Sequence, residues 1–274
     1  MLLSACSMVS LGYRHAPTLL AWRAAEYFEL DAEQRMQFRS RLETVHAWHR
    51  REQLAPLLAT LEETRERLSG PVSRDDGEWL VSALLGHYRA VVARIVAESA
   101  DLLATLRPEQ IAGLERRLAE KAAEYEQIWI DAPPDEVRRA RFERIRGHAE
   151  DWLGRLEPWQ DAWLRARLDA IPVDYRRWRE DRSRREAAFV ALLAEVSLDG
   201  TGPGANSAHG AALRGWALDW DEGRSAEQRM AADRLRHEYI GLGVALINGA
   251  TPAQRDRIRA RLAAYVSALA AHLR

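Results

Sequence analysis

Apolar side chains recur along this chain at intervals of three and four residues, which is the period of an amphipathic helix. The clearest stripes consist of Phe38, Leu42, Val45 and His49, then Ile111, Leu114, Leu118, Tyr125 and Trp129, and finally Ile258, Leu262, Tyr265 and Leu269. The sequence shows no sustained alternation of apolar and polar residues, which strands would require, and its prolines fall between the periodic segments. The pattern predicts an all-α protein of long antiparallel amphipathic helices, arranged as a helical bundle or an array of hairpins.

The periodic segments predict helices over residues 17–28, 31–53, 56–69, 75–105, 108–130, 134–155, 158–170, 174–196, 211–219, 225–247 and 252–272. The segment "DGTGPGANSAHG" at 199–210 is rich in glycine and contains proline and serine, so it predicts a flexible surface loop.

Five short segments share one form, in which a helix-capping position is followed three residues later by Gln: "LDAEQ" (30–34), "LRPEQ" (106–110), "LEPWQ" (156–160), "RSAEQ" (224–228) and "ATPAQ" (250–254). A Gln at this position can accept a hydrogen bond from the backbone N–H of the capping residue, and Pro is favoured at the first helical position. Asp31, Ser225 and Thr251 are good capping residues, whereas Arg107 and Glu157 are poor ones. Capped helix starts account for the motifs, and a role in binding is the alternative interpretation.

The amino-acid composition favours a folded protein with a core and argues against a nucleic-acid binder. Apolar residues make up 47% and charged residues 30% of the chain, and the net charge is −1. The apolar fraction is sufficient for a core, and the lack of a cationic excess argues against a nucleic-acid binder, which needs one to displace counterions. No segment approaches the roughly 20 apolar residues that a membrane-spanning helix needs, so the sequence predicts none.

Cys6 is the only cysteine, which excludes an intramolecular disulfide and a Cys-x-x-Cys site. The order Leu3-Ser4-Ala5-Cys6 fits a lipobox, at which signal peptidase II cleaves before a cysteine that then carries acyl chains such as palmitate. A lipoprotein signal peptide also needs a cationic start and an apolar stretch of about 7–15 residues, but only two residues precede this motif. We therefore expect either that the start codon is assigned too late or that the signal has been lost.

The lipobox and the loop together suggest an organisation in five parts. We expect a signal-peptide remnant, a short membrane-proximal tether, a helical body, a flexible loop and a C-terminal helical hairpin packed on the body, at residues 1–6, 7–16, 17–198, 199–210 and 211–274.

Candidate metal chemistry rests on Glu43, His46 and His49, which share one face of a predicted helix. Two histidines with a distant third ligand could hold Zn²⁺, but di-iron bundles need a second Glu-x-x-His unit, which the sequence lacks. Because His49 continues an apolar stripe, the preferred interpretation is that both histidines pack between helices. Gly-x-Ser-x-Gly, His-Glu-x-x-His and Walker motifs are also missing. We predict no metal site, no cofactor and no enzymatic activity.

The chain contains ten tryptophans. Trp159 and Trp163 are one helical turn apart with Trp152 just upstream, and Trp178 shares a face with Tyr175. Packing between helices explains them, because Trp buries a large area. The alternative is a concave surface lined by aromatic residues and arginine that binds a peptide or a lipid. The segment "YRRWREDRSRRE" at 175–186 combines six arginines with three acidic residues and predicts a solvated, salt-bridged helix face.

Residues 3–56 resemble a lipoprotein family of Gram-negative bacteria that is a domain-of-unknown-function family. The resemblance rests on "LLSACSMVSLGY", "APTLLAW", "EYF", "LDAEQ" and "HAWHRREQLAP", and it continues through "LRPEQIAGLERRLAEKAAEYE". It implies a lipid-anchored, all-helical envelope protein without an assigned activity. The Gln-bearing helix starts are more loosely similar to the LTxxQ motifs of the periplasmic Spy/CpxP proteins, which suggests chaperone-like function as a class of hypothesis.

These observations predict a protein anchored by lipid on Cys6 and facing the periplasm. Ser7, which follows the cysteine, favours the outer membrane under enterobacterial sorting rules. We expect chaperone-like binding of unfolded or partner proteins, with a structural or assembly accessory that docks on one envelope machine as the alternative. The predicted partners are the membrane, through the lipid, and protein clients or an envelope partner, but not nucleic acid.

Overall fold

The structure is a computed structural model that describes residues 2–198, 208–219, 221 and 223–273, and within these residues it is helical and contains no strand. Its elements are α1 (Leu2–Arg14), α2 (Ala16–Phe28), α3 (Ala32–Trp48), the π-helical segment η1 (His49–Gln53), α4 (Leu54–Arg67), α5 (Arg74–Leu103), α6 (Pro108–Trp129), α7 (Pro134–Leu153), α8 (Pro158–Ala170), α9 (Tyr175–Leu198), α10 (Ala208–Leu218), α11 (Ala226–Asn248) and α12 (Pro252–Ala270). The all-α prediction is confirmed, and every predicted helix end lies within three residues of an observed one. The sequence analysis missed α1.

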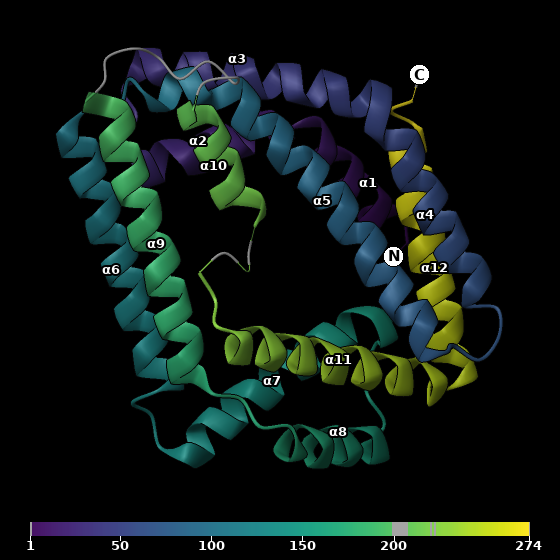
Figure 1. Ribbon diagram of the computed structural model, residues 1–274. Coiled ribbons are helices and arrows are strands. Elements are labelled where there is room, and N and C mark those ends of the chain that lie inside the picture. The colour runs from purple at the N-terminus through teal and green to yellow at the C-terminus, as the bar shows by residue number, and fades with distance from the viewer. Residues whose placement is uncertain (1, 199–207, 220, 222, 274) are drawn as a thin grey trace.

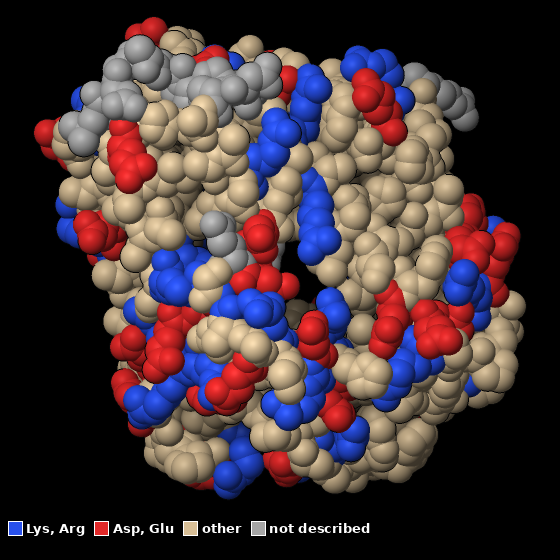
Figure 2. Space-filling view, in the orientation of Figure 1, with Lys and Arg blue, Asp and Glu red and all other residues tan. Residues whose placement is uncertain are grey.

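The helices form a frame around an opening (Figure 1). In the view of Figure 1, α3 forms the top side and α7, α8 and α11 form the bottom side. The pair α6 and α9 forms the left side, and the pair α4 and α12 faces it on the right. The long helix α5 crosses the frame from α3 and α10 to α11. In the space-filling view a hollow remains near the middle, with Arg, Asp and Glu side chains around it (Figure 2).

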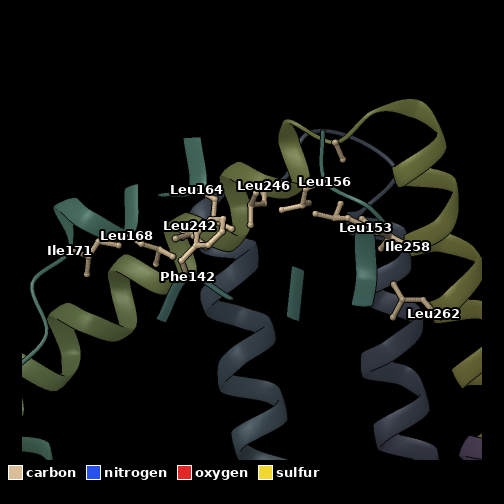
Figure 3. Close-up of a cluster of buried hydrophobic side chains, with 11 residues drawn as sticks. Phe142, Leu153, Leu156, Leu164, Leu168, Ile171, Leu242, Leu246, Ile258 and Leu262 are labelled. Atoms are coloured by element: carbon tan, nitrogen blue, oxygen red, sulfur yellow. The ribbon is translucent and has the colours of Figure 1, made fainter. Parts of the chain in front are cut away.

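Two separate buried clusters stabilise the frame. The first joins α5, α6, α9 and α10 through Leu30, Ala100, Leu106, Ile111, Leu114, Leu193 and Leu213. The second joins α7, α8, α11 and α12, and it includes Phe142, Leu153, Leu156, Leu164, Leu168, Ile171, Leu242, Leu246, Ile258 and Leu262 (Figure 3). Burial of one such side chain is worth about 1.5–3 kcal/mol, so these contacts between sequence-distant helices hold the frame closed.

The helix starts predicted from the Gln motifs are confirmed. In all five, the Gln Oε1 accepts a hydrogen bond from the backbone N–H of the capping residue, at distances between 2.8 and 3.1 Å. The side chains of the three good capping residues also accept a hydrogen bond from the Gln backbone N–H, and these residues are Asp31, Ser225 and Thr251.

Four of the five glutamines also pair with one another, which the sequence analysis did not predict. Gln34 and Gln110 exchange side-chain amide hydrogen bonds of 3.3 and 2.8 Å, and Gln160 and Gln254 exchange two of 2.9 Å. All four are buried, whereas Gln228 is half-buried and only caps its own helix. The Nε2 atoms of these glutamines also donate hydrogen bonds to backbone carbonyls: Gln34 to Thr105, Gln110 to Glu29, Gln160 to Gly249 and Gln254 to Arg155. Each of these carbonyls lies two residues before the residue that caps the partner glutamine's helix. Two corners of the frame therefore share one reciprocal arrangement of helix starts.

The turn between α3 and α4 lies at η1. The Leu54 N–H donates to the His49 carbonyl, five residues earlier, instead of four. Pro56 follows within the next turn and has no N–H for the Glu52 carbonyl. A π-helical segment and a proline are both established causes of sharp helix bends, and here they turn the chain from one side of the frame to the next (Figure 1).

Three regions differ from the expected organisation. Residues 7–14 lie in α1, which packs on α12, rather than in an extended tether. Residues 208–210 begin α10, while residues 199–207 of the predicted loop lie outside the described residues. The expected C-terminal hairpin is not formed, because α11 packs on α5 and α8 whereas α12 packs on α1, α4 and α7. An apolar stripe shows that a helix face is covered, but not which helix covers it.

The helix α5 is more apolar than the sequence analysis recognised. A window of 18 residues within Arg74–Leu103 has a mean hydropathy of 1.4, and none of that window is buried. By length and composition alone this helix could cross a membrane, so the expectation that no segment qualifies was wrong. A helix this apolar is ordinarily covered by its neighbours or by lipid. In this structure much of its apolar side is accessible.

Candidate functional site

An apolar groove runs beside α5, between this helix and α4, α7, α11 and α12. It consists of two adjoining hollows of about 390 and 420 Å³. Both hollows are lined by the same five residues, Thr64, Leu68, Leu80, Gly243 and Ile247, so they form one depression, which we call the α5 groove. Part of its wall is the second buried cluster, through Leu153, Leu246, Ile258 and Leu262.

The side chains of α5 provide an accessible apolar ridge. Gly77, Val81, Leu84, Tyr88 and Val92 follow one another at intervals of three or four residues. The first three line the α5 groove, and the last two line a separate hollow of about 600 Å³. The exposed fractions of Leu84 and Tyr88 are 41% and 48%. At 1.5 Å of rise per residue, the ridge is about 22 Å long.

Two glycines shape the groove in opposite ways. A Cβ atom on Gly77 would lie 2.7 Å from Cγ2 of Ile240, so this glycine allows α5 and α11 to approach closely. A Cβ atom on Gly243 would meet nothing within 4 Å, although Gly243 lines both hollows. The space in front of Gly243 is therefore part of the groove, and a larger side chain at this position would occupy it.

Each of the two hollows is lined by a tryptophan that stacks with an arginine, and Arg67 lines its hollow as well, whereas Arg261 lies outside the lining. The Arg67 guanidinium lies 4.2 Å from the centroid of the Trp79 ring, and that of Arg261 lies 5.0 Å from the Trp152 ring. A concave surface lined by aromatic residues and arginine is thus present. Trp152 was among the tryptophans considered for it, whereas Trp159 lines a different, smaller hollow.

The charged groups beside the groove are paired. Arg67 forms ion pairs of 2.8 Å with Glu63 and 2.7 Å with Asp76. Hydrogen bonds from Ser73 and then from Arg67 lower the pKa of Asp76 to about 2, so its carboxylate is ionised at neutral pH. The groove can therefore take apolar side chains out of water while ion pairs at its margin stay hydrated.

A polar site lies on α9, where Asp181 has an exposed side-chain fraction of only 7%. Its carboxylate accepts hydrogen bonds from Arg224 at 2.6 and 2.9 Å and from Arg184 at 2.6 Å. Burial raises the pKa of Asp181, but these hydrogen bonds outweigh it and lower that pKa. Because both carboxylate oxygens accept from guanidinium groups, the site is an ion pair that joins α9 to the start of α11. Ion pairs of Arg177, Arg179, Arg182 and Arg184 confirm that the face at 175–186 is salt-bridged. The expectation that this face is solvated was wrong at Asp181, which is buried.

The two histidines considered as metal ligands lie around Tyr13, together with His272. The centroids of the His46, His49 and His272 rings are 4.8, 5.7 and 4.9 Å from that of Tyr13. The Tyr13 hydroxyl and His49 Nδ1 are hydrogen bonded at 2.8 Å, as the packing interpretation predicts. Desolvation lowers the pKa of all three histidines and raises the pKa of Tyr13 to about 12. The sequence analysis missed Tyr13 and His272, because neither continues the His46–His49 stripe.

The other predicted site residues are not part of this cluster. Glu43 pairs with Arg39 at 3.0 Å on the surface of α3. Among the described residues, no group of three or more His, Cys, Asp or Glu side chains could hold a metal ion. The backbone of Leu3, Ser4, Ala5 and Cys6 lies in α1, but their side chains are outside the described part of the structure. Acylation of Cys6 therefore stays a prediction from the sequence.

The fold and the groove define an all-helical frame with an apolar groove along one crossing helix. Residues 26–200 match a family of unknown function, DUF6279, and because this is more than half of the chain, the chain belongs to that family. The family match includes the α4, α5 and α7 walls of the groove, while the α11 and α12 walls follow it in the sequence. No curated protein and no solved structure matches the chain.

Proposed function

We propose that this protein is a non-enzymatic, lipid-anchored envelope protein that faces the periplasm and holds apolar segments of unfolded or partner polypeptides in the α5 groove. The observation that supports the proposal is the accessible apolar side of α5, which lines the groove at Leu80, Val81 and Leu84. Extended apolar patches on a protein surface mark interaction sites. Binding by desolvation also needs no nucleotide, in agreement with the lack of nucleotide motifs in the sequence.

The dimensions suit a short extended segment. The part of the ridge that lies along the α5 groove, from Gly77 to Leu84, is about 10 Å long at 1.5 Å of rise per residue. A fully extended chain advances about 3.3–3.6 Å per residue, so this part corresponds to about three residues. Side chains on alternate positions of such a segment point the same way, so about two of them can enter the groove together. Arg67 and Arg261, each stacked on a tryptophan, add charge and planar contact surface beside the apolar walls. The proposed ligand is therefore an extended segment with apolar residues at alternate positions.

The anchoring part of the proposal rests on Cys6 and the residues before it. More than one acyl chain on the same site gives stable membrane attachment, whereas a single chain gives only marginal binding. Expressed behind a functional lipoprotein signal peptide, the protein should incorporate an alkyne fatty acid and partition into detergent. Cys6→Ser should abolish the labelling, and equal labelling of this variant would reject acylation at Cys6.

The holding function can be tested by blocking the groove without removing any contact. Gly243→Leu places a side chain in the empty part of the groove, and Gly86→Leu adds the same side chain to an exposed site on α5 where a Cβ also meets nothing within 4 Å. The wild-type protein and Gly86→Leu should slow the aggregation of rhodanese diluted from denaturant at near-stoichiometric ratios. Gly243→Leu should lose most of this effect.

Two outcomes would count against the proposal. If the wild-type protein protects no better than an equal mass of albumin, holding of unfolded chains is rejected. In-cell crosslinking that then captures one stoichiometric partner would favour an assembly accessory. If Gly243→Leu protects as well as Gly86→Leu, the holding surface lies elsewhere on the molecule.

A further inference from the structure

Exposed apolar side chains are concentrated on one side of the two N-terminal helices. Met8 and Leu11 on α1 and Leu19 and Trp22 on α2 expose 68%, 52%, 55% and 64% of their surface. They follow one another at helical spacing, and the gap between Leu11 and Leu19 is filled by the exposed His15. We call these four apolar residues the outer stripe.

The opposite side of the same helices holds them to the frame. Tyr13 packs among the three histidines, and Pro17 and Ala21 are buried. α1 packs along α12, and α2 packs on α3 and α6. The two helices are therefore fixed with one side inward, and the outer stripe faces away from the body without a covering element among the described residues.

The surroundings of the outer stripe have the composition of a membrane-surface helix. The sequence from residue 2 to residue 28 carries Arg14 and Arg23 but a single acidic residue, Glu26, which pairs with Arg23 at 3.1 Å. Arginines beside an apolar stripe can reach phosphate groups while the stripe enters the acyl boundary, and Trp is favoured at that depth. With Arg23 paired to Glu26, the segment keeps one positive charge, at Arg14. A protein partner would satisfy the apolar stripe equally well, but the exposed Trp22 and the lack of excess negative charge are the features that an anionic bilayer surface favours.

We propose that α1 and α2 dock on the surface of an anionic phospholipid bilayer through the outer stripe. The proposal extends the lipid-anchoring part of the proposed function, since Met8 is two residues from Cys6 and acyl chains on that cysteine would hold α1 close to the membrane. The stripe would then fix the orientation of the frame on the membrane, which a flexible lipid tether alone does not do.

The test uses the full chain with Cys6→Ser, so that acylation plays no part. Vesicles of phosphatidylethanolamine and phosphatidylglycerol at about 3:1 are titrated with the protein, and bound protein is measured by co-sedimentation. We expect binding that Leu19→Ser/Trp22→Ser weakens by about tenfold or more, because the two side chains together bury several methylene equivalents. Met36→Ser/Met230→Ser removes two side chains that are 68% and 66% exposed on α3 and α11, and it should bind like the parent protein.

A second readout does not depend on comparing these double variants. Acyl chains brominated near the headgroup should quench part of the tryptophan emission of the Cys6→Ser protein, and Trp22→Phe, which keeps an apolar ring, should lose that part. Absence of vesicle binding, or equal binding by both double variants, would overturn the proposal. So would a stripe variant that binds vesicles normally but changes the oligomeric state, because the outer stripe would then contact a second copy. Gly243→Leu should bind vesicles normally, so a failure of the groove proposal is distinguishable from a failure here.

Discussion

The helices α5 and α6 are both long and both carry apolar stripes, but the structure uses them in opposite ways. α6 buries residues along its first four turns, including Ile111, Leu114 and Ala122, because α2 and α9 pack along it. α5 is longer and more apolar, yet its buried residues begin only at Ser99. Several helices contact α5, but they leave every residue before Ser99 at least partly exposed. Apolar content therefore does not decide burial, and the open side of α5 is the feature on which we base the proposed binding role.

The largest expected effect is the difference in stability lost when a leucine is truncated in the first buried cluster and on the ridge of α5. Leu114 is 2% exposed in the first buried cluster, and Leu84 is 41% exposed on the ridge of α5. Leu114→Ala should lower the free energy of unfolding by about 3 kcal/mol, because it removes a packed side chain and leaves a cavity. Leu84→Ala should lower it by less than about 1 kcal/mol, because the side chain is already partly in water. Urea titrations measure both, and comparable losses would show that α5 is a core helix like α6.

A smaller loss should follow from breaking the buried amide pair at the start of α6. Gln110→Ala removes the hydrogen bonds that Gln110 exchanges with the buried Gln34 and the one that it donates to the Glu29 carbonyl, and it should cost about 1–3 kcal/mol. Gln228→Ala is the matched control, since this glutamine caps a helix in the same way but pairs with no other glutamine. It should cost no more than about 1 kcal/mol. If both substitutions cost the same, the pairing adds nothing beyond capping.

The smallest effect concerns pH and the histidines around Tyr13. The ionisable groups near them are Arg14 on α1, Arg50 in η1 and His87 on α5, all of which disfavour a further positive charge. The pKa values of His46, His49 and His272 are lowered in the folded protein from the ordinary 6.5, so the unfolded chain binds protons more readily. Stability should be fully present above about pH 6.5 and fall as the pH drops toward the folded-state values.

Urea titrations between about pH 7.5 and pH 5 would reveal this decline, which carboxylates with low pKa values do not produce in that range. His49→Gln should reduce it, because one of the three groups no longer titrates. Stability that stays constant or rises on acidification would contradict the burial of neutral histidines in this cluster.

Much of the fold follows from short-range signals that the sequence carries. The Gln motifs mark helix starts because the Gln side chain bonds its own capping residue, and the i, i+3, i+4 stripes mark the helices that follow. The pairing of Gln34 with Gln110 was out of reach, since it depends on two motifs 76 residues apart meeting in space. For the same reason the cluster of Tyr13 and His272 could not be predicted from His46 and His49.

The sequence predicted the kind of surface that the groove presents, but not where it lies. The sequence suggested a concave site lined by aromatic residues and arginine, but it gave no way to know that α11 crosses α5 at Gly77 or that Gly243 faces open space. The apolar character of α5 was the available signal. It was overlooked because scattered small and polar residues interrupt the apolar run, although the mean hydropathy of the window is high.

The claim that α5 is left open in order to bind is tested most directly by an equilibrium titration of a labelled octapeptide with Leu or Phe at alternate positions and Ser between them. Fluorescence anisotropy should show saturable binding to the wild-type protein and to Gly86→Leu, with affinities equal to within a factor of about two. Gly243→Leu should weaken binding by about tenfold or more while remaining at least as stable in urea, because Leu is a better helix former than Gly by roughly 0.8 kcal/mol. Equal affinity of Gly243→Leu and Gly86→Leu for the peptide would contradict the account.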